Sequence, residues 1–190
     1  MPDVAIVGGG PAGLSAALFT AKNGLETVVF DTDETWMHKA HLFNYPGIRS
    51  ISGSEFMALT RGQVRDRGAE VYTDDAVTGI EAGADGFDVE TESDSHTAEY
   101  VVLATGGDRS IADDLECAFD DEGTVDVGLD METSVENLYA TGAMVRAEKW
   151  QAIIAAGDGA SAALHILSKE RGEHFHDFDT PADVPTLESE

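Results

Sequence analysis

Basic residues are scarce in this chain. Its 190 residues include 11 Lys and Arg against 37 Asp and Glu, which gives a formal net charge of −26. A charge of this sign repels nucleic acids and anionic membranes, so we expect neither as a partner. The acidic residues are spread along the whole chain and favour a halophilic protein, because concentrated salt screens their mutual repulsion. An ordinary acidic cytosolic protein is the alternative.

Cysteine is nearly absent as well, since Cys117 is the only one. A single cysteine excludes an intramolecular disulfide bond and is typical of a reducing compartment. The sequence has no signal-peptide pattern, and no apolar run approaches the roughly 20 residues of a membrane span. We therefore expect a cytoplasmic protein that does not span a membrane.

The hydrophobic content of 42% is sufficient for one domain with a core. We expect this domain to occupy residues 1–172. Residues 173–190 are acidic and polar, contain Pro181 and Pro185, and show no periodicity. They are therefore predicted to form a flexible tail.

The beginning of the chain predicts a strand–helix–strand unit. Residues 4–7 form a short apolar run of the kind found in buried parallel strands. Residues 11–23 have helical periodicity that stops at Gly24, and residues 27–30 predict the next strand. Such a unit must cross over with right-handed chirality.

The middle of the chain predicts one helix and a set of strands. Ser54 can cap a helix over residues 54–68, with Phe56, Leu59 and Val64 on its buried side. Four strand-like segments follow, at residues 70–73, 77–81, 87–91 and 97–104. Turn residues separate the last three and indicate an antiparallel β-meander inserted in the sheet.

The last third predicts a return to the sheet and a long helix. Residues 108–122 are acidic and weakly patterned, as in a surface connection, and short strands are predicted at 124–127 and 138–140. A helix is predicted over residues 149–168, ending near Gly172. Its expected buried face consists of Ile153, Ile154, Ala160, Leu164 and Leu167.

The motif Gly8-x-Gly10-x-x-Gly13, between a strand and a helix, predicts dinucleotide binding. In this pattern the glycines allow a tight turn, an approach to the pyrophosphate and close helix–strand packing. Asp31, after the second strand, would accept hydrogen bonds from ribose hydroxyls and repel the 2′-phosphate of NADP. The motif alone does not distinguish FAD from NAD, and a glycine-rich turn without a ligand is the alternative.

Several further stretches make the chain similar to thioredoxin-reductase-like flavoproteins, members of the pyridine nucleotide-disulfide oxidoreductase family. The resemblance extends from Val4 to Leu167 and implies a Rossmann-like α/β fold, with a central parallel sheet and an antiparallel β-meander insert. It also implies that the cofactor is FAD. The stretches that carry it are residues 7–31, Asn44-Tyr45-Pro46-Gly47, Ala104-Thr105-Gly106-Gly107, residues 133–142 and residues 149–157.

The resemblance also implies which residues contact FAD. The N-terminus of the last helix would point backbone N–H groups at the flavin pyrimidine carbonyl and stabilise the negative charge of the reduced ring. The implied cofactor-binding residues are Gly8, Gly10, Pro11, Ala12, Gly13, Asp31, Asn44, Ala76, Ala104, Thr105, Gly106, Gly142, Ala143, Trp150, Gln151 and Ala152.

Three departures from the family pattern change the functional expectation. The nicotinamide domain that family members carry between the two Ala-Thr-Gly-like stretches is replaced by a short connection between Gly106 and Ala140. The redox Cys-x-x-Cys is absent. The family's Gly-Asp is replaced by Gly142-Ala143, and Gly157-Asp158 does not restore it, because that pair falls inside the predicted last helix.

We therefore expect a FAD-dependent oxidoreductase or electron-transfer flavoprotein without disulfide reductase activity, forming a homodimer. Its open flavin face would accept electrons from free NADH or from an electron-donor protein. A FAD-binding module or subunit without turnover is the alternative from another class, and an NAD-binding dehydrogenase is a third. His38 and His41 are candidate proton donors or solvated loop histidines, and Cys117 is expected to be inert. No metal site is expected.

Overall fold

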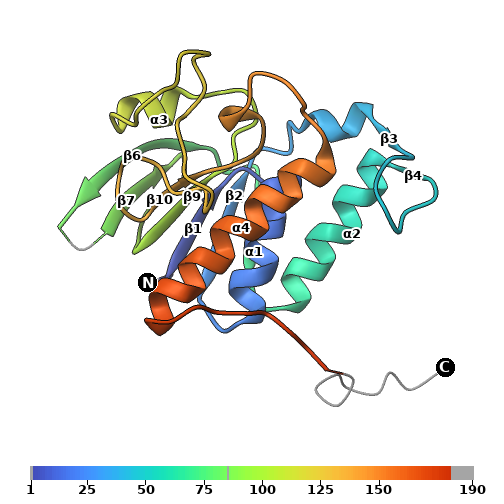
Figure 1. The fold of residues 1–190 in the computed structure, drawn as a ribbon, viewed down its shortest axis with the longest axis horizontal. Helices are drawn as coiled ribbons and strands as arrows, with labels where there is room; N and C mark the ends of the chain where they lie inside the picture. The colour runs from blue at the N-terminus through green and yellow to red at the C-terminus, as the bar shows by residue number, and fades with distance from the viewer. Residues whose placement is uncertain (1, 85, 181–190) are drawn as a thin grey trace.

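The computed structural model describes residues 2–84 and 86–180. Its centre is a parallel sheet with the strand order β10-β9-β1-β2-β5, in which every neighbouring pair is parallel (Figure 1). The predicted α/β class and parallel sheet are therefore confirmed. The strands are β1 (Val4–Val7), β2 (Thr27–Asp31), β5 (Glu70–Thr73), β9 (Tyr100–Leu103) and β10 (Leu138–Ala140).

Three helices cover one face of this sheet: α1 (Pro11–Lys22), α2 (Gly53–Asp66) and α4 (Ala152–Arg171). Helices α1 and α4 lie against each other so closely that a Cβ at Gly159 would be 2.0 Å from the carbonyl oxygen of Ala12. Gly172 ends α4 with a left-handed φ of +67°, at the predicted position.

The predicted meander covers the other face as a separate antiparallel sheet of β6 (Val77–Gly83), β7 (Gly86–Thr91) and β8 (Ser95–Ala98). One boundary in this region differs from the prediction. The segment 97–104 is two strands, because the chain leaves the meander at Glu99 and enters the parallel sheet as β9. Only Ala98 of β8 is buried, whereas β9 is buried throughout.

The short connection between β9 and β10 is more structured than a surface loop. It contains α3 (Ser110–Asp114) and buries Ala112 and Cys117 against the sheet. The strand predicted at 124–127 is wrong. Val125 makes an isolated bridge to Phe119 and is 1% exposed, so its apolar character reflects core packing rather than a strand.

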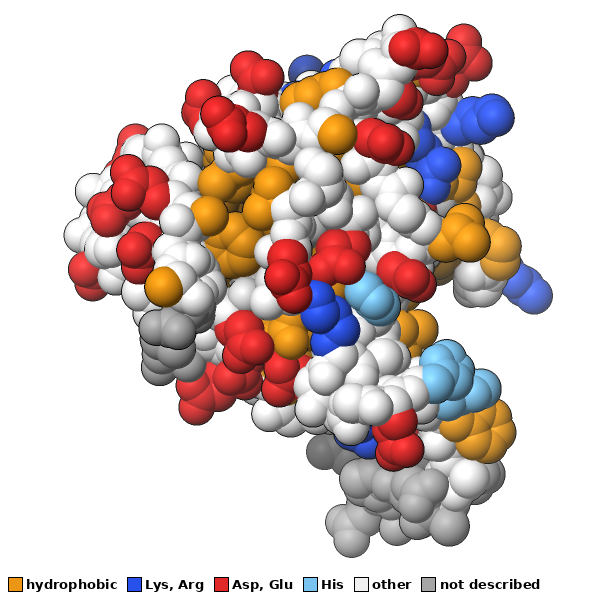
Figure 2. Space-filling model, turned by 60° about the vertical axis from the view of Figure 1, so that its left-hand side comes forward, with side chains coloured by type: hydrophobic (Ala, Val, Ile, Leu, Met, Phe, Trp, Pro, Cys, Tyr) orange, Lys and Arg blue, Asp and Glu red, His pale blue; other side chains and the backbone are white. Residues whose placement is uncertain are grey.

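Acidic side chains occupy much of the molecular surface. On the face in Figure 2 they are numerous at the top, the left and the centre, and the basic side chains are few. Among the helices of the described residues, none combines the length and the apolar character that crossing a bilayer requires.

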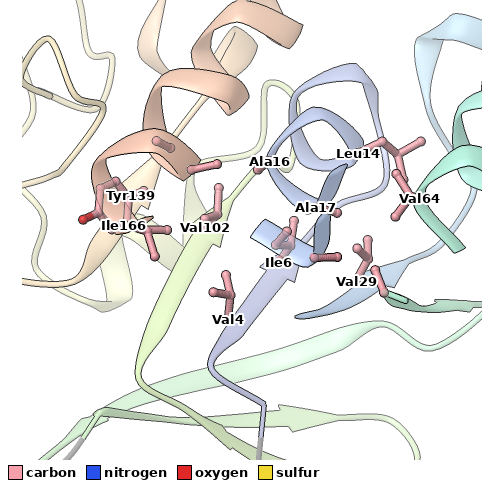
Figure 3. Packing of buried hydrophobic residues seen from close by; sticks show 14 of the residues in the cluster. Val4, Ile6, Leu14, Ala16, Ala17, Val29, Val64, Val102, Tyr139 and Ile166 are labelled. Atoms are coloured by element: carbon pink, nitrogen blue, oxygen red, sulfur yellow. The ribbon is translucent and has the colours of Figure 1, made fainter. Parts of the chain in front are cut away.

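Strands β1, β2, β9 and β10 are buried on both faces because two clusters share their alternating residues, whereas the edge strand β5 is partly exposed. Toward the helices, Ile6, Val29, Val102 and Tyr139 pack with side chains of α1, α2 and α4 (Figure 3). Toward the meander and the connection, the next residues along each strand pack in a second cluster. That cluster includes Ala5, Val7, Val28, Phe30, Val101, Leu103 and Ala140.

Helix α2 starts earlier than predicted and shows a different buried face. Its N-cap is Ser52, whose hydroxyl accepts a hydrogen bond from the backbone N–H of Glu55 at 3.2 Å, so Ser54 is not the cap. Leu59 is 62% exposed. It lies two residues beyond the fully buried Met57 and thus about 200° around the helix from it.

Helix α4 begins at Ala152 rather than at residue 149. Its buried face is formed by Ala162, Ala163, Ile166 and Leu167, so only Leu167 of the predicted set is fully buried, and Ile153 is exposed. Small residues prevail at this face because α1 approaches so closely. Residues 173–180 of the predicted tail fold back toward α1, where Lys22 pairs with Asp177 at 2.6 Å. The rest of the predicted tail lies outside the described residues.

Candidate functional site

The parallel arrangement brings most of the predicted site residues to one edge of the sheet. The carboxyl ends of parallel strands meet there, which is where ligands bind in open α/β sheets. Gly8 follows β1, Asp31 ends β2, Ala104 follows β9 and Gly142 follows β10. Ala76 lies between β5 and β6, and its carbonyl accepts a hydrogen bond from Glu92 N–H at 3.0 Å.

Two glycines of the motif are required by the fold itself. Gly8 has a φ of +105°, and a Cβ there would lie 2.3 Å from the carbonyl oxygen of Ala104. A Cβ at Gly13 would lie 1.9 Å from the carbonyl oxygen of Gly8. No side chain can be placed at either position without moving backbone atoms, so these glycines hold α1, β1 and β9 in contact.

Gly10 is different, because neither its conformation nor its packing requires a glycine. Its φ is −77°, and the nearest described atom to an added Cβ, Thr35 Oγ1, is 3.7 Å away. Gly10 is the N-cap of α1, with Pro11 as the first helical residue, and in the described structure no side chain caps this end. The first-turn N–H groups, among them those of Ala12 and Gly13, are therefore available to an anion.

Asp31 is held firmly at the end of β2. It is 6% exposed, its Oδ1 accepts a hydrogen bond from Gly9 N–H at 3.1 Å, and its Oδ2 pairs with Arg61 at 2.7 Å. Arg61, from α2, also pairs with Asp33, and this hydrogen bond lowers the pKa of Asp33. Sequence reasoning missed Arg61, although its position four residues after Met57 and three before Val64 puts it on the buried face.

The turn after β10, called the η2 turn below, is held by side chains. It comprises Gly142–Val145, and the N–H of Gly142 donates to Asp158 Oδ2 at 3.3 Å. Arg146 forms an ion pair with Asp158. Arg109, at the start of α3, donates to the carbonyl oxygens of Met144 at 2.8 Å and Ala143 at 3.1 Å.

Asp158 lies inside α4, as predicted, and is 6% exposed. Its carboxylate nevertheless contacts the η2 turn through Gly142 N–H, next to Ala143, which has no carboxylate of its own. No local sequence pattern indicates this contact, because Asp158 and Gly142 belong to different elements. The buried charge is balanced by Arg146, as a buried carboxylate requires.

The loop before α2 meets the beginning of α4. Asn44 Nδ2 donates to Gln151 Oε1 at 2.8 Å, and Gln151 is the N-cap of α4 immediately before Ala152. Trp150 contacts Trp36, with 5.4 Å between ring centroids. Trp36 opens the 3-10 helix η1 (Trp36–Lys39) and was not among the predicted site residues.

Thr105 and Gly106 form the turn that leaves β9. The Thr105 hydroxyl donates to the carbonyl oxygen of Asp108 at 2.6 Å, and Gly106 has a φ of +69°. This turn lies beside the glycine motif, because Ala104 contacts Gly8. On the other side, a Cβ at Gly142 would be 3.4 Å from the Cβ of Ala12. Three turns that are distant in the sequence therefore adjoin.

The two candidate proton donors already have partners. His38 Nε2 lies 2.7 Å from Asp33 Oδ1 and its Nδ1 lies 2.8 Å from Ser54 Oγ. His41 opens the short hairpin of β3 (His41–Leu42) and β4 (Ile51–Ser52), where its Nε2 lies 2.9 Å from Ser50 Oγ. Their roles as proton donors stay predictions.

Cys117 lies in the cluster beneath the connection, which also includes Met144 of the η2 turn, and is 7% exposed. Burial raises the pKa of its thiol, so the thiol stays protonated and poorly nucleophilic at neutral pH. The described residues include no cluster of three or more His, Cys, Asp or Glu side chains that could hold a metal ion.

The profile of the pyridine nucleotide-disulphide oxidoreductase family matches residues 2–110 and 46–160 of the chain. The chain therefore belongs to this family, and its fold is that of a thioredoxin-reductase-like FAD-binding domain, as the sequence predicted.

Curated relatives are thioredoxin reductases. That of Streptomyces clavuligerus is 37% identical over 113 residues, which cover 55% of this chain and 34% of the relative. That of Spironucleus barkhanus is 35% identical over 106 residues, covering 53% and 34%. The chain thus spans about a third of the length of the curated relatives that it matches.

Solved structures agree on the fold. A thioredoxin reductase from Gloeobacter violaceus superposes with a TM-score of 0.83 and 21% identity, covering 94% of this chain and 99% of the other. A ferredoxin-flavin thioredoxin reductase from Clostridium acetobutylicum gives a TM-score of 0.78 and 19% identity, covering 90% and 99%. At these identities the likeness establishes architecture alone.

Proposed function

We propose that this protein binds FAD along the carboxyl edge of its parallel sheet and acts as an oxidoreductase or electron-transfer flavoprotein. Gly10 is the observation that carries the proposal. The fold explains Gly8 and Gly13 but gives no steric reason for a glycine at residue 10, where an added Cβ would lie at an ordinary 3.7 Å from its nearest atom, Thr35 Oγ1. A pyrophosphate bound against the first turn of α1 would supply that reason.

The residues present fit an adenine dinucleotide of this kind. The uncapped N-terminus of α1 would hold the pyrophosphate, and Asp31 would accept hydrogen bonds from the adenosine ribose. The flavin would lie toward Asn44 and the N-terminus of α4, where Gln151 and Ala152 present the helix dipole. A bound flavin would supply hydride or single-electron chemistry.

The same geometry suggests how the chain would tune that chemistry. The N-terminus of α4 offers backbone N–H groups and a positive dipole, which favour negative charge on a reduced ring. The Asn44–Gln151 hydrogen bond fixes the loop beside this helix end. Asn44 and Gln151 would therefore orient the ring, and the helix end would stabilise its charge.

We propose that disulfide reduction is not part of this activity. Thiol–disulfide exchange requires one thiolate to attack and a second to resolve the mixed disulfide. The chain has one cysteine, and that cysteine is buried away from the proposed flavin end. Free NADH or an electron-donor protein would reduce the flavin, with the protein working as a homodimer.

The first experiment is an absorbance spectrum of the purified protein followed by release and identification of the flavin. We expect FAD rather than FMN. Gly10→Val should abolish flavin binding without unfolding the protein, because the side chain would occupy the proposed pyrophosphate position while its Cβ has only Thr35 Oγ1 within 4 Å among the described atoms. Gly62→Val, at a helical glycine where an added Cβ meets no described atom within 4 Å, is the matched control. Full flavin occupancy in Gly10→Val would refute the placement of the site.

A FAD-binding module without turnover is the second candidate. Two observations favour it: the connection between β9 and β10 holds only α3 in place of a nucleotide domain, and Ala143 offers no side chain to the cofactor. Anaerobic titration with NADH, NADPH and reduced ferredoxin separates the candidates. Bleaching by any donor supports the oxidoreductase, and a yellow protein inert to all three supports the module.

A further inference from the structure

The chain has two tryptophans, and they lie against each other. Their ring centroids are 5.4 Å apart at an interplanar angle of 43°, within the range of interacting aromatic pairs. Trp36 is 56% exposed and Trp150 is 50% exposed. Two of the largest apolar side chains are thus kept half exposed at one place on the surface, which is typical of a binding site.

The fold holds both rings in this position. The indole Nε1–H of Trp150 donates to the carbonyl oxygen of Arg146 at 2.8 Å, and Arg146 is anchored by the buried Asp158. Trp36 stands at the start of η1, whose N-cap is Thr35. The Thr35 hydroxyl accepts a hydrogen bond from Met37 N–H at 3.3 Å. Hydrogen bonds therefore anchor the segments that carry both rings.

The pair lies between the two ends of the proposed cofactor site. On one side, Thr35, which precedes Trp36, has its Oγ1 atom 3.7 Å from the position of an added Cβ at Gly10. The ring of Trp36 reaches the turn after β9, where an added Cβ at Gly107 would lie 3.6 Å from its Cη2 atom. On the other side, Trp150 directly precedes Gln151, the N-cap of α4.

We propose that the Trp36–Trp150 pair forms an aromatic platform for the isoalloxazine ring of FAD, with the ring stacking on Trp36. This inference rests on the proposed function and adds the contact that holds the flavin end. A planar aromatic ring system can stack on a half-exposed indole face, and the platform lies beside the N-terminus of α4, where the flavin is proposed to bind. Trp36, at the start of η1, is thereby a proposed FAD-binding residue that the predicted site did not include.

The test compares two ligands that share one end. FAD carries the isoalloxazine ring, whereas ADP retains the adenosine and pyrophosphate without it. We expect Trp36→Leu to weaken FAD binding about tenfold, as the loss of one aromatic stacking contact does, and to leave ADP binding unchanged. Trp36→Phe, which keeps an aromatic face, should retain most of the affinity. Calorimetric titration measures all of these values.

Fluorescence of the bound flavin gives a second readout that does not depend on activity. An indole in stacking contact quenches flavin emission, so bound FAD should be brighter in Trp36→Leu than in the wild type. Phe178→Leu is the matched control, because Phe178 is 75% exposed and lies in the C-terminal segment rather than at the sheet edge.

Each other outcome identifies a different failure. Equal weakening of FAD and ADP in Trp36→Leu would mean that the substitution disturbs the whole site, and would overturn the proposed stacking on Trp36. Unchanged FAD affinity and unchanged flavin emission would also overturn it, even if the reduction rate by NADH fell, since Trp36 would then contact the donor. Absence of FAD and ADP binding in the wild-type protein would instead refute the proposed function.

Discussion

The glycine turn after β1 and the η2 turn after β10 lie side by side, yet different interactions hold them. The glycine turn depends on backbone contacts too close for any side chain, at Gly8 and Gly13. The η2 turn depends on charged side chains from three separate segments: Asp158, Arg146 and Arg109. The glycine turn can therefore be predicted from a local sequence motif, whereas the η2 turn forms only when distant parts of the chain come together.

The largest effect that we predict is on the glycine turn. Gly13→Ala places a Cβ 1.9 Å from the carbonyl oxygen of Gly8. Because backbone must move to relieve this contact, we expect a loss of about 3 kcal/mol or more in the free energy of unfolding. Urea denaturation measures it, with Gly62→Ala as the control at an open helical glycine. A decrease in the free energy of unfolding no larger than that of Gly62→Ala would mean that close contacts do not require a glycine at residue 13.

This comparison explains which features could be predicted from the sequence. The glycine motif, the strands of the parallel sheet and the end of α4 at Gly172 follow from local patterns. The contacts of Arg109 and Asp158 join different elements, so no periodicity or spacing reports them. The spacing of Arg61 from Met57 and Val64 indicates its burial but not its partners. The break at Glu99 was missed because Ala98 and Tyr100, on either side of it, are both buried although they belong to different sheets.

The second prediction concerns the charged turn. Asp158→Ala leaves Arg146 without its partner and the Gly142 N–H without an acceptor. We expect a loss of about 2 kcal/mol, below the 3–5 kcal/mol of fully buried pairs, because the Arg146 side chain is 33% exposed. Asp158→Asn, which can still accept from Gly142, should lose less. Asp114→Ala, at an exposed carboxylate, is the control in denaturation experiments.

The salt dependence of stability should distinguish the Asp158–Arg146 ion pair from the repulsion among the many acidic side chains. Between about 0.1 M and about 1 M KCl the screening length falls from about 10 Å to about 3 Å, so repulsion within a chain of charge −26 weakens. We expect the wild-type protein to become more stable across this range. The deficit of Asp158→Ala should persist, because the Asp158 carboxylate is largely shielded from solvent. Stability that is flat or falls with KCl would refute the halophilic hypothesis.

A smaller, pH-dependent effect on stability is expected at the ion-pair cluster of Arg61 with Asp31 and Asp33. Arg61 lowers the pKa of Asp33 below its ordinary value of 3.8. A lowered native pKa stabilises the fold above the unfolded value, and this contribution disappears as the pH falls through the native value. Wild-type protein should therefore lose stability below about pH 4, and Asp33→Asn should lose less over the same interval. Parallel curves for the two proteins would contradict this linkage.

The smallest effect on either turn is expected from Cys117→Ser. Cys117 packs in the cluster between the sheet and the connection, apart from Gly10, Asp158 and the tryptophan pair. The hydroxyl introduces a polar group into a buried site, so a stability loss of about 1 kcal/mol is expected. FAD affinity and reduction by an added donor should not change, because Cys117 is not among the residues proposed to bind FAD. Disulfide reductase turnover that is present in the wild type and disappears in Cys117→Ser would instead make the thiol catalytic, and would require a second thiol from another chain.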